Sequence, residues 1–508
     1  MALILLLPLL LAICLPLYYI VPALLDPLRH IPGPFWARFT RCWKLIEIFG
    51  GHFEKTNVEL HRRYGPVVRI APNEYSIDDP EATKEIYGLG GNFVKSPWYI
   101  ASGNPDPHAR PDLFTDLDPK RHAANRRKVA ALYSMTNLVQ MEPFVNECSE
   151  LLVKRFKEFA KAGRDVDMGH WLQCYAFDVI GHITLANRFG FLDAGEDISG
   201  MMAAIDDYLS YLTPVGVFSE WHRQIAGLLS HFSKDDTGMS AILTFAQAQL
   251  SKRKLESSRS EKRHSNQGDF ITKLLQLHEA DPGKVDMKDV FSTLMTNIGA
   301  GSDTTSISLG SVIYHLCRYP YTMQTLRKEI DDMEKADRIS DPVTFAQTQQ
   351  MPYLQAVIKE ALRVHPATGL PLGRVVPKGG KVIAGQMFPE GNVVGINSWV
   401  AHANTDVFGL DAAVFRPERW LESKEKTTIL DKYFFSFGMG SRTCIGKNIS
   451  LLEMAKLIPQ LVRYFDIELA NPQKEWTTTN KWFVKQGDFF CRVRLRSDGL
   501  GRAIEQHD

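Results

Sequence analysis

A single cysteine, Cys444, stands in a setting that stabilises a thiolate. It lies two residues after Arg442, behind a glycine turn that contains Gly440 and ahead of a predicted helix. A helix N-terminus and a nearby guanidinium both favour the charged sulfur, and Gly440 and Gly446 allow a flat ligand to approach the backbone closely. A lone cysteine is more often a small buried apolar residue. The combination here instead predicts a functional thiolate.

A second set of polar groups lies inside a predicted helix that spans residues 286–318. Apolar residues recur at helical spacing and no proline interrupts them, which gives a helix roughly 45–50 Å long at 1.5 Å per residue. Its middle, residues 300–305, contains a glycine, an acid and two threonines. Gly301 costs up to ~1 kcal/mol of helix propensity, and threonine hydroxyls bond back to carbonyls and open the helix locally. The segment is therefore either a kink with solvated side chains or a polar functional groove.

Five fixed positions around the cysteine match the pattern F-x-x-G-x-R-x-C-x-G, and they are Phe437, Gly440, Arg442, Cys444 and Gly446. At ordinary residue frequencies, the odds of this match by chance are on the order of one in ten thousand. The pattern resembles the haem-binding loop of the cytochrome P-450 family, whose cysteine thiolate is the axial ligand of the iron. Residues 300–305 resemble the oxygen-activation groove of the same family. That resemblance implies catalytic roles for Thr304, which hydrogen-bonds dioxygen, and for Asp303, which supplies protons.

Two further motifs follow in the order that this resemblance requires. Glu360 and Arg363 form an i, i+3 pair, and Arg419 lies in the run from Phe415 to Trp420, ahead of the cysteine loop. Such pairs are common on solvated helix faces, so this pair supports the resemblance only through its position in the order of motifs along the chain. The resemblance implies that Glu360, Arg363 and Arg419 form a buried charge cluster that supports the haem loop.

The carboxylates of a haem need cations from separate segments of the chain. The family's W-x-x-x-R pattern is present with His122 in place of the tryptophan and with Arg126 retained. The resemblance implies that the cofactor-binding residues are His122, Arg126, Arg374, Phe437, Arg442 and Cys444, and that Cys444 is also the metal ligand. The basic run from Arg126 to Lys128 would either dock an acidic redox partner or simply be solvated.

Length and composition indicate one large enzyme. The 508 residues are 44% hydrophobic and 23% charged, and no linker divides them. A net charge of +1 argues against nucleic acid as a partner, and seven scattered cysteines without a CxxC pair favour a reducing compartment. We expect a mainly α fold with small β-sheets (α+β), the cytochrome P-450 fold behind one N-terminal transmembrane helix.

The N-terminal segment, Met1 to Leu25, has no charged side chain and exceeds the ~20 residues that a helix needs to span a bilayer. A signal peptide, the alternative, would need basic residues ahead of a short apolar run. Four basic residues between positions 29 and 44 follow the segment, so the positive-inside rule places the rest of the chain in the cytosol. We expect a transmembrane anchor and the start of a hinge over residues 1–28, a cytosolic haem-thiolate monooxygenase domain over residues 29–508, and a single-pass location in the endoplasmic reticulum membrane.

The resemblance implies an oxidoreductase that holds haem b (heme b), uses O₂ as co-substrate and acts on a lipophilic small molecule. No strand, G-x-G-x-x-G and helix unit appears, so NADPH electrons are expected from a separate flavoprotein reductase. The chain is similar to filamentous-fungal members related to pisatin demethylase, which serve secondary-metabolite biosynthesis or detoxify plant compounds. A haem-thiolate isomerase, a peroxide-driven enzyme and a non-enzymatic haem sensor are the alternatives, although each has little use for Asp303 and Thr304.

The substrate pocket is expected to be apolar. Its walls are expected from residues 96–99, 294–300, 367–370 and 482–484, although each aromatic residue there could equally be core packing. The nearby cations, Lys95 and Lys481, are expected at the edges of these segments.

Four expectations concern local structure. Residues 64–77 read as a small hairpin. Residues 212–221 are apolar and are expected to dip into the lipid interface. Pro459 should kink or end the helix that follows Cys444. Residues 251–269 are rich in charge and should form a surface connection between helices.

Overall fold

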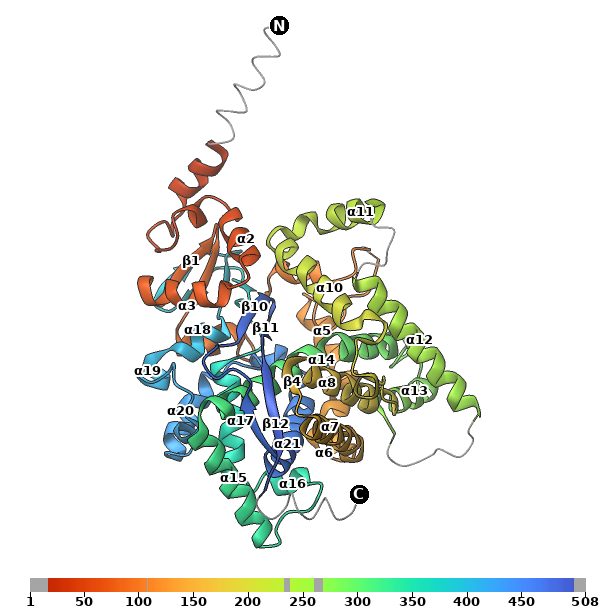
Figure 1. The fold of residues 1–508 in the computed structure, drawn as a ribbon. Helices are drawn as coiled ribbons and strands as arrows, with labels where there is room; N and C mark the ends of the chain where they lie inside the picture. Colours follow the sequence, from red (N-terminus) through yellow and green to blue (C-terminus); the bar gives the residue numbers. More distant parts are fainter. Residues whose placement is uncertain (1–16, 107, 233–237, 260–267, 498–508) are drawn as a thin grey trace.

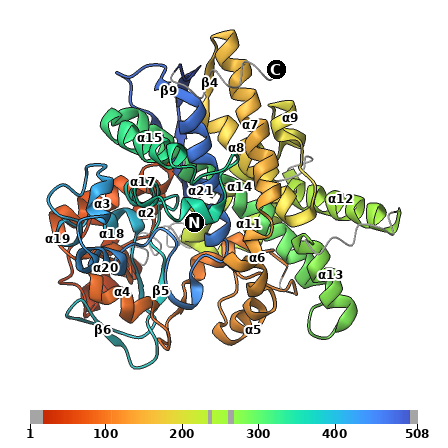
Figure 2. The same ribbon diagram turned by 90° about the horizontal axis from the view of Figure 1, so that it is seen from below.

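One long helix, α14 (Met287–Arg318), crosses the centre of the molecule and positions much of the candidate site (Figure 1). The computed structural model describes residues 17–106, 108–232, 238–259 and 268–497. The helix begins where predicted because Asp286 caps it: the Asp286 carboxylate accepts the Asp289 amide at 2.8 Å and the Asp289 carboxylate accepts the Asp286 amide at 3.1 Å. Figure 2 shows α14 among other helices, which it packs against over most of its length.

The other helices of the described residues are α2 (Cys42–Phe49), α3 (Phe53–Tyr64), α4 (Pro80–Tyr87), α5 (Pro119–Val129), α6 (Met135–Val139), α7 (Glu142–Ala162), α8 (Met168–Leu185), α9 (Phe191–Ala194), α10 (Met201–Val215), α11 (His222–Phe232), α12 (Gly238–Arg259), α13 (Phe270–Ala280), α15 (Pro320–Lys335), α16 (Phe345–Thr348), α17 (Pro352–Val364), α18 (Ser398–Ala403), α19 (Thr405–Phe408), α20 (Lys424–Lys432) and α21 (Lys447–Tyr464). Short 3₁₀ helices include η2 (Pro97–Ser102), η5 (Gly216–Trp221) and η7 (Gly440–Arg442). The α14 helix packs against α8, α17 and α21.

The strands of the described residues form small sheets. They are β1 (Val67–Ala71), β2 (Glu74–Ile77), β3 (Val94–Lys95), β4 (Asp165–Asp167), β5 (Arg374–Val375), β6 (Lys381–Ile383), β7 (Gln386–Phe388), β8 (Val393–Gly395), β9 (Phe465–Leu469), β10 (Thr477–Lys481), β11 (Phe483–Gly487) and β12 (Phe490–Leu495). One sheet has the order β1-β2-β8-β5-β3, with β2 and β8 parallel, and a second has the order β4-β12-β9. β6–β7 and β10–β11 are separate hairpins, and β9 and β11 contact α14.

Two predicted strand features are confirmed. The segment from residue 64 to 77 contains the β1–β2 hairpin, in which Val67 pairs with Ile77. Along β12, Cys491 and Val493 are buried while Phe490, Arg492 and Arg494 are exposed, as period-two alternation requires. The mainly helical fold with small sheets therefore agrees with the expected fold class.

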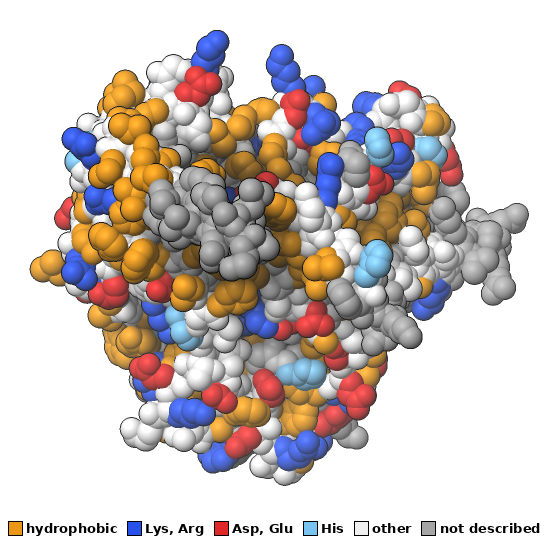
Figure 3. Space-filling model, turned by 90° about the horizontal axis from the view of Figure 1, so that it is seen from above, with side chains coloured by type: hydrophobic (Ala, Val, Ile, Leu, Met, Phe, Trp, Pro, Cys, Tyr) orange, Lys and Arg blue, Asp and Glu red, His pale blue; other side chains and the backbone are white. Residues whose placement is uncertain are grey.

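Only part of the predicted anchor lies in the described residues. Residues 17–25 are helical and largely exposed, whereas residues 1–16 lie outside the described part of the chain. No helix that the structure describes has the length and apolar character needed to cross a bilayer. Hydrophobic side chains gather on the face seen from above in Figure 3, and exposed apolar residues near the start of the chain include Leu25, Phe35, Trp36 and Phe49.

The folded domain begins just after this exposed helix. Asp26 forms an ion pair of 2.6 Å with Arg69, whose side chain is 2% exposed, and Arg69 also donates to the Leu28 carbonyl at 2.8 Å. Leu28 is itself buried. The Arg69 amide donates to the Pro32 carbonyl at 2.9 Å, so the segment expected as a hinge is packed along β1. Asp26 and Leu28 thus belong with the folded domain.

Two expectations about chain breaks are wrong. α21 continues through Pro459 to Tyr464, because Leu452 to Tyr464 are buried on all sides and this packing offsets the hydrogen bond that proline cannot donate. Within the expected surface connection, residues 251–259 are the end of α12, and residues 260–267 lie outside the described part. Arg253 in α12 bonds Asp269, the N-cap of α13, at 2.8 Å, which holds the two helices together.

The apolar stretch from Leu212 to Trp221 is mostly buried, contrary to expectation. Leu212 and Val217 are 2% and 5% exposed, and among the apolar residues of the stretch only Trp221, at 55%, is well exposed. The reason is that η5 packs on η2: a Cβ at Gly216 would lie 2.3 Å from the Trp98 indole nitrogen, so only glycine fits there. Arg41 closes the opposite side, donating to the Val217 carbonyl at 2.9 Å.

Candidate functional site

The loop that carries Cys444 is held in shape by its glycines and its backbone. The Cys444 amide donates to the Phe437 carbonyl at 2.8 Å, which closes the loop. Gly440 has φ +66°, and a Cβ there would lie 1.7 Å from the Tyr87 carbonyl oxygen, so no other residue fits without moving α4. The following helix, α21, begins three residues after the cysteine, with Gly446 as its N-cap.

The Cys444 thiol lies deep in the protein and still retains exposed surface. Burial raises the pKa of this thiol, whereas the backbone N–H groups of Gly446 and Lys447 and the Arg126 guanidinium lower it. Burial is the largest of these effects. A sulfur at a helix N-terminus with backbone donors directed at it suits a metal ion, because a coordinated metal deprotonates a thiol outright.

The middle of α14 presents an open face. Ala300 is exposed and Thr304, one turn later, is partly exposed, while Ser302, Asp303 and Thr305 are buried. The Thr304 hydroxyl donates to the Ala300 carbonyl at 2.8 Å, which is the backward bond expected for this segment. Residues 300–305 remain helical, so the kink alternative is wrong.

Two close contacts fix this part of α14 against its neighbours. A Cβ at Gly301 would lie 2.8 Å from Ile180 on α8, so the glycine permits the close approach of the two helices. The Thr305 and Ser450 hydroxyls are hydrogen-bonded at 2.8 Å. Because Ser450 lies in the first turns of α21, this bond connects the open face of α14 with the helix that follows Cys444.

Asp303 is fully buried and is bound by two side chains that the sequence did not indicate. Lys485 on β11 forms an ion pair with it at 2.9 Å, and the Gln173 amide on α8 donates to it. Burial raises the pKa of Asp303, and Lys485 opposes that rise. Lys485 also lies 4.0 Å from Asp206, which binds Lys481 at 2.6 Å. Asp303 is thus connected, through Lys485 and Asp206, to partly exposed side chains.

The structure brings the predicted cations together in one buried region. Burial and the nearby Arg374 lower the pKa of Arg442 to about 10, and burial with Arg442 and Arg126 lowers the pKa of His122 to about 4. Both terminal nitrogens of Arg442 are buried and lack a hydrogen-bond partner in the described residues. A buried guanidinium without a partner is costly, so these groups fit a bound carboxylate. The donor set therefore agrees with a haem.

Lys95, which adjoins the segment 96–99, belongs to this cationic region. Its side chain is 6% exposed, and Lys95 pairs with Arg374 across β3 and β5. Arg374 donates to the Gly373 carbonyl at 3.0 Å. No sequence motif marks Lys95, and only the strand pairing, which joins residues far apart in the chain, places it beside Arg374.

The predicted charge cluster is present. Arg363 donates to both carboxylate oxygens of Glu360 at 2.8 Å, and Arg419 donates to Glu360 at 2.8 Å. All three side chains are at most 1% exposed. The remaining guanidinium donors bond the His402 carbonyl and carbonyls between Phe408 and Val414, and Arg419 also bonds the Asp411 carboxylate at 3.2 Å. Glu360 and Asp411 together therefore compensate the two guanidiniums, as a buried cluster requires.

Aromatic residues from two of the predicted wall segments pack together. Trp98 and Trp482 stack with ring centroids 4.5 Å apart, and Tyr99 and Phe114 contact Trp482 edge-on. Phe483 also bridges to Thr368, which belongs to a third segment. Lys481, at the end of β10, is partly exposed, in agreement with an edge position.

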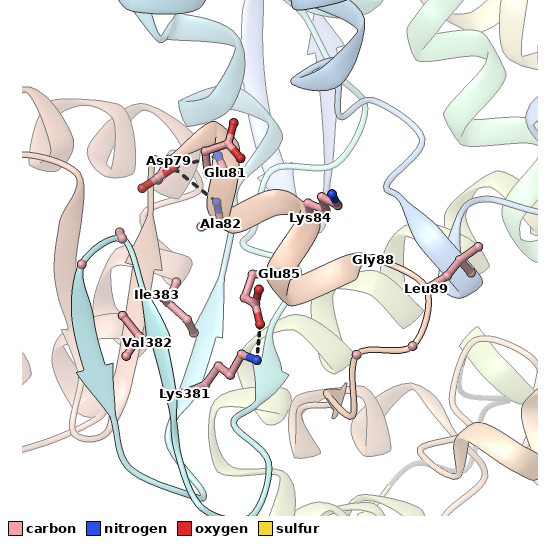
Figure 4. A pocket seen from close by; sticks show the side chains of 14 residues that line it. Asp79, Glu81, Ala82, Lys84, Glu85, Gly88, Leu89, Lys381, Val382 and Ile383 are labelled. Carbon is pink, nitrogen blue, oxygen red and sulfur yellow. Dashed lines mark hydrogen bonds and ion pairs between the residues drawn. The ribbon is translucent and has the colours of Figure 1, made fainter.

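A separate surface hollow of about 640 Å³ lies between α4 and the β6–β7 hairpin (Figure 4). Charged side chains surround it, and Glu85 and Lys381 form an ion pair within it. None of the predicted site residues lines this hollow. It is therefore distinct from the candidate site.

Comparison with known proteins agrees with this geometry. The model of the cytochrome P450 family matches residues 31–489. A pisatin demethylase of Fusarium vanettenii is 40% identical over 474 residues, covering 92% of this chain and 91% of that protein, and a second pisatin demethylase of the same organism is 39% identical over 491 residues, covering 96% and 92%. A cytochrome P450 monooxygenase of Emericella nidulans is 37% identical over 479 residues, covering 92% and 94%. The chain therefore belongs to the cytochrome P450 family, and it is a haem-thiolate monooxygenase.

Proposed function

We propose that Cys444 is the axial ligand of a haem b iron, and that His122, Arg126, Arg374, Phe437 and Arg442 contact the cofactor. The observation that supports this most strongly is the pair of buried, unpartnered Arg442 nitrogens beside the other cations. A haem with a thiolate ligand supplies activated oxygen from O₂, which favours insertion of one oxygen atom into a C–H bond. The protein's own groups hold that cofactor and manage the protons.

Asp303 and Thr304 are the proposed catalytic residues. The Thr304 hydroxyl lies on the open face of α14, whereas the Asp303 carboxyl is buried behind it. The Asp303 carboxyl holds a proton that enters along Asp206 and Lys485, since Lys485 binds Asp303 at 2.9 Å and lies 4.0 Å from Asp206. Proton transfer from a positioned group contributes typically about 10²–10⁴-fold to rate.

Electrons are proposed to come from NADPH through a separate flavoprotein reductase on the same membrane. Arg127 on α5 is exposed and Arg126 is partly buried, so only the outer part of the basic run is available to a partner. Its positive charge suits an acidic reductase surface.

Residues 1–25 are proposed to anchor the enzyme in the endoplasmic reticulum membrane, with the catalytic domain, residues 26–508, in the cytosol. Support comes from the charge-free N-terminal sequence and from residues 17–25, which are helical and expose Leu24 and Leu25 at 60% and 77%. This boundary lies three residues before the one that the sequence suggested, because Asp26 and Leu28 pack on the domain.

The proposed substrate is a neutral lipophilic secondary metabolite, with detoxification of a plant compound as the second candidate. The stacked Trp98 and Trp482 favour an apolar ligand, and two relatives are named for demethylation of pisatin. A charged substrate would need a buried counter-charge of its own, and the one buried cation described on the neighbouring Tyr99 and Phe114 rings, Lys95, lies with the cations of the cofactor region.

The test is turnover with reductase, NADPH and labelled dioxygen against a panel of terpenoid, polyketide and alkaloid compounds. We expect a product that carries one labelled oxygen atom, or a dealkylated product whose released fragment carries it. Turnover without label and without NADPH consumption would favour the isomerase or peroxide-driven alternative. If only strongly charged compounds shifted the haem spectrum, the apolar-pocket proposal would be refuted.

A further inference from the structure

Trp482 has a backbone conformation that a bulky residue rarely adopts. Its φ is +74°, in the left-handed region, although it is not a glycine. It forms the turn of the β10–β11 hairpin, in which Lys481 pairs directly with Phe483. Its side chain is 4% exposed and stacks on Trp98 in the expected pocket wall. A strained residue of this kind persists only where its surroundings hold it, so its supports determine where the indole lies.

The segment that follows α17 supplies the first support. The Gly369 amide donates to the Trp482 carbonyl at 2.9 Å, and the Val484 amide donates to the Ala367 carbonyl at 2.8 Å. A Cβ at Gly369 would lie 2.3 Å from the side-chain nitrogen of Asn480. Glycine therefore lets this segment lie close enough to the hairpin to bond its turn.

Asn480, two residues before the turn, connects this segment with α3. Its side-chain amide donates to the Gly369 carbonyl at 3.1 Å and to the Glu54 carboxyl at 2.7 Å. Its backbone amide donates to the Gly51 carbonyl, just ahead of α3, at 2.8 Å. Both donors of the side-chain amide are thereby used, which fixes the direction of the Asn480 side chain.

Glu54 is a buried carboxyl on α3, outside every motif of the sequence. It is 0% exposed, and its second oxygen has no hydrogen-bond partner in the described residues. Burial raises the pKa of Glu54, and the hydrogen bond from Asn480 opposes that rise. A carboxyl buried in this way is costly as an anion, so the neutral acid is favoured. The bond from Asn480 needs only an acceptor oxygen, which a neutral acid and a glutamine both offer.

We propose that Glu54 is a specificity-determining positioning residue of the substrate pocket, which acts through Asn480 to hold Trp482 in its left-handed conformation with the indole against Trp98. This inference rests on the proposed haem site and its pocket. Loss of the bond to Glu54 frees Asn480 to turn away from Gly369, so that Trp482 relaxes and its indole moves. Ligands that contact the aromatic wall then bind less tightly, whereas ligands that contact only the iron do not.

The experiment measures azole binding to the full-length, substrate-free holoenzyme from the shift of the haem spectrum. Imidazole reports on the iron alone, and clotrimazole, an imidazole that carries three aromatic rings, also reports on the pocket wall. Glu54→Leu removes the acceptor and nearly keeps the size of the side chain, whereas Glu54→Gln retains an acceptor oxygen. Glu329→Leu is the matched control, because Glu329 on α15 accepts the Tyr353 and Leu354 amides at 2.8 and 2.9 Å, neither of which belongs to the hairpin. The carbon monoxide band of each protein shows whether its haem site is folded.

We expect Glu54→Leu to raise the Kd of clotrimazole about tenfold and to change the Kd of imidazole by less than about twofold, because only the larger ligand contacts the aromatic wall. Glu54→Gln and Glu329→Leu should stay within about twofold of wild type for either ligand. The inference is overturned if Glu54→Leu leaves the Kd of clotrimazole unchanged or changes both dissociation constants equally. It is also overturned if Glu54→Gln is as impaired as Glu54→Leu.

A second background tests whether Glu54 acts through Trp482. Trp482→Gly adopts the left-handed conformation without strain and removes the indole. In that background, Glu54→Leu should change the Kd of clotrimazole by less than about twofold, because residues that act as one unit are not additive. An effect as large as that in the wild-type background would contradict the inference. If Glu54→Leu does not retain haem, Asn480→Ser breaks the same bond from β10, and the same outcomes decide.

The outcomes separate this inference from the proposed function. A wild-type protein that binds haem but lacks the carbon monoxide band of thiolate ligation would refute the haem-thiolate assignment, whatever Glu54 does. A wild-type protein with that band, together with an unchanged Kd of clotrimazole in Glu54→Leu, would refute only the positioning role of Glu54.

Discussion

Two opposing effects act on the Cys444 thiol. Burial disfavours the thiolate, whereas backbone amides and Arg126 favour it. Replacement by alanine removes the only ligand proposed for the iron. We expect Cys444→Ala, after reduction and addition of carbon monoxide, to lack the red-shifted Soret band of thiolate ligation. A Cys444→Ala protein that kept this band would refute the assignment.

The Thr304 hydroxyl can be tested against a similar hydroxyl one turn later. Thr304→Ala should still bind haem and substrate, but it should divert about tenfold more of the reducing equivalents into peroxide, because the proton donor on the open face is lost. The matched control is Ser308→Ala, since Ser308 is buried and its hydroxyl donates to the Thr304 carbonyl at 2.8 Å. The ratio of product to NADPH consumed is the measurement, and equal ratios in both variants would show that the groove is misplaced.

The pH dependence of coupling should report on Lys485. Burial raises the pKa of Asp303 above its usual value, and the ion pair with Lys485 lowers it in part. Lys485→Met removes the lowering influence, so the pKa of Asp303 rises further and the carboxyl becomes neutral at higher pH. Because Asp303 supplies protons in its protonated form, we expect the alkaline limb of the pH profile of kcat to move to higher pH.

Lys481→Met provides the comparison, because Lys481 binds Asp206 but does not contact Asp303. Its alkaline limb should coincide with that of wild type. A Lys485→Met profile with an unchanged alkaline limb would mean that Asp303 does not control the protons used in turnover.

Among the elements, α17 and the segment before α20 are joined by Glu360, Arg363 and Arg419. Glu360→Ala leaves the buried Arg363 without a carboxylate and Arg419 with Asp411 alone, so we expect a loss of ~3–5 kcal/mol in the free energy of unfolding and release of haem. Glu422→Ala, which removes a partly exposed partner of Arg416 and Lys426, should cost less than ~1 kcal/mol. Chemical denaturation measures both, and equal costs would contradict the role of the buried cluster.

Elements whose boundaries depend on local sequence were predictable. α14 was placed to within one residue, because periodicity and the Asp286 cap are local signals, and the β1–β2 hairpin and β12 followed from alternation. Elements that depend on distant partners were not. Pro459 is tolerated only because α21 is buried on all sides, and η5 is buried only because Gly216 admits the Trp98 indole.

The same distinction holds for the candidate site. Cys444, Thr304 and Arg442 lie in short motifs that can be read from neighbouring residues. Lys95 and Lys485 carry no motif, since each meets its partner through a strand pairing or a packing contact between segments far apart in the chain. In the sequence, Lys95 and Lys485 cannot be told from surface lysines. Only the fold shows that Lys95 is buried and that Lys485 binds the buried Asp303.

At the scale of the whole molecule, only a truncation that ends before Asp26 should remove the proposed anchor without destabilising the catalytic domain. Removal of residues 1–25 should strongly weaken attachment to membranes while haem binding is kept, because these residues are exposed where described. Removal of residues 1–29 also deletes Asp26 and leaves Arg69 buried without its partner, so it should in addition lower the unfolding free energy by ~3–5 kcal/mol. Flotation with vesicles and chemical denaturation measure the two effects, and loss of the haem domain on removal of residues 1–25 would contradict the separation.

The ion pair between Asp26 and Arg69 has a consequence for how the enzyme would move on a bilayer. A flexible linker would let the catalytic domain rotate freely above the membrane and meet its electron donor in any orientation. Here Asp26, the residue after the exposed helix, is paired with Arg69, and the Pro32 carbonyl is hydrogen-bonded to β1. The segment that joins the helix to the domain is therefore held against the domain. With residues 1–25 as the proposed anchor, the height and tilt of the domain above the lipid would be fixed. Its encounter with the proposed reductase would then be a two-dimensional search by lateral diffusion, with the basic face of α5 held at a constant height.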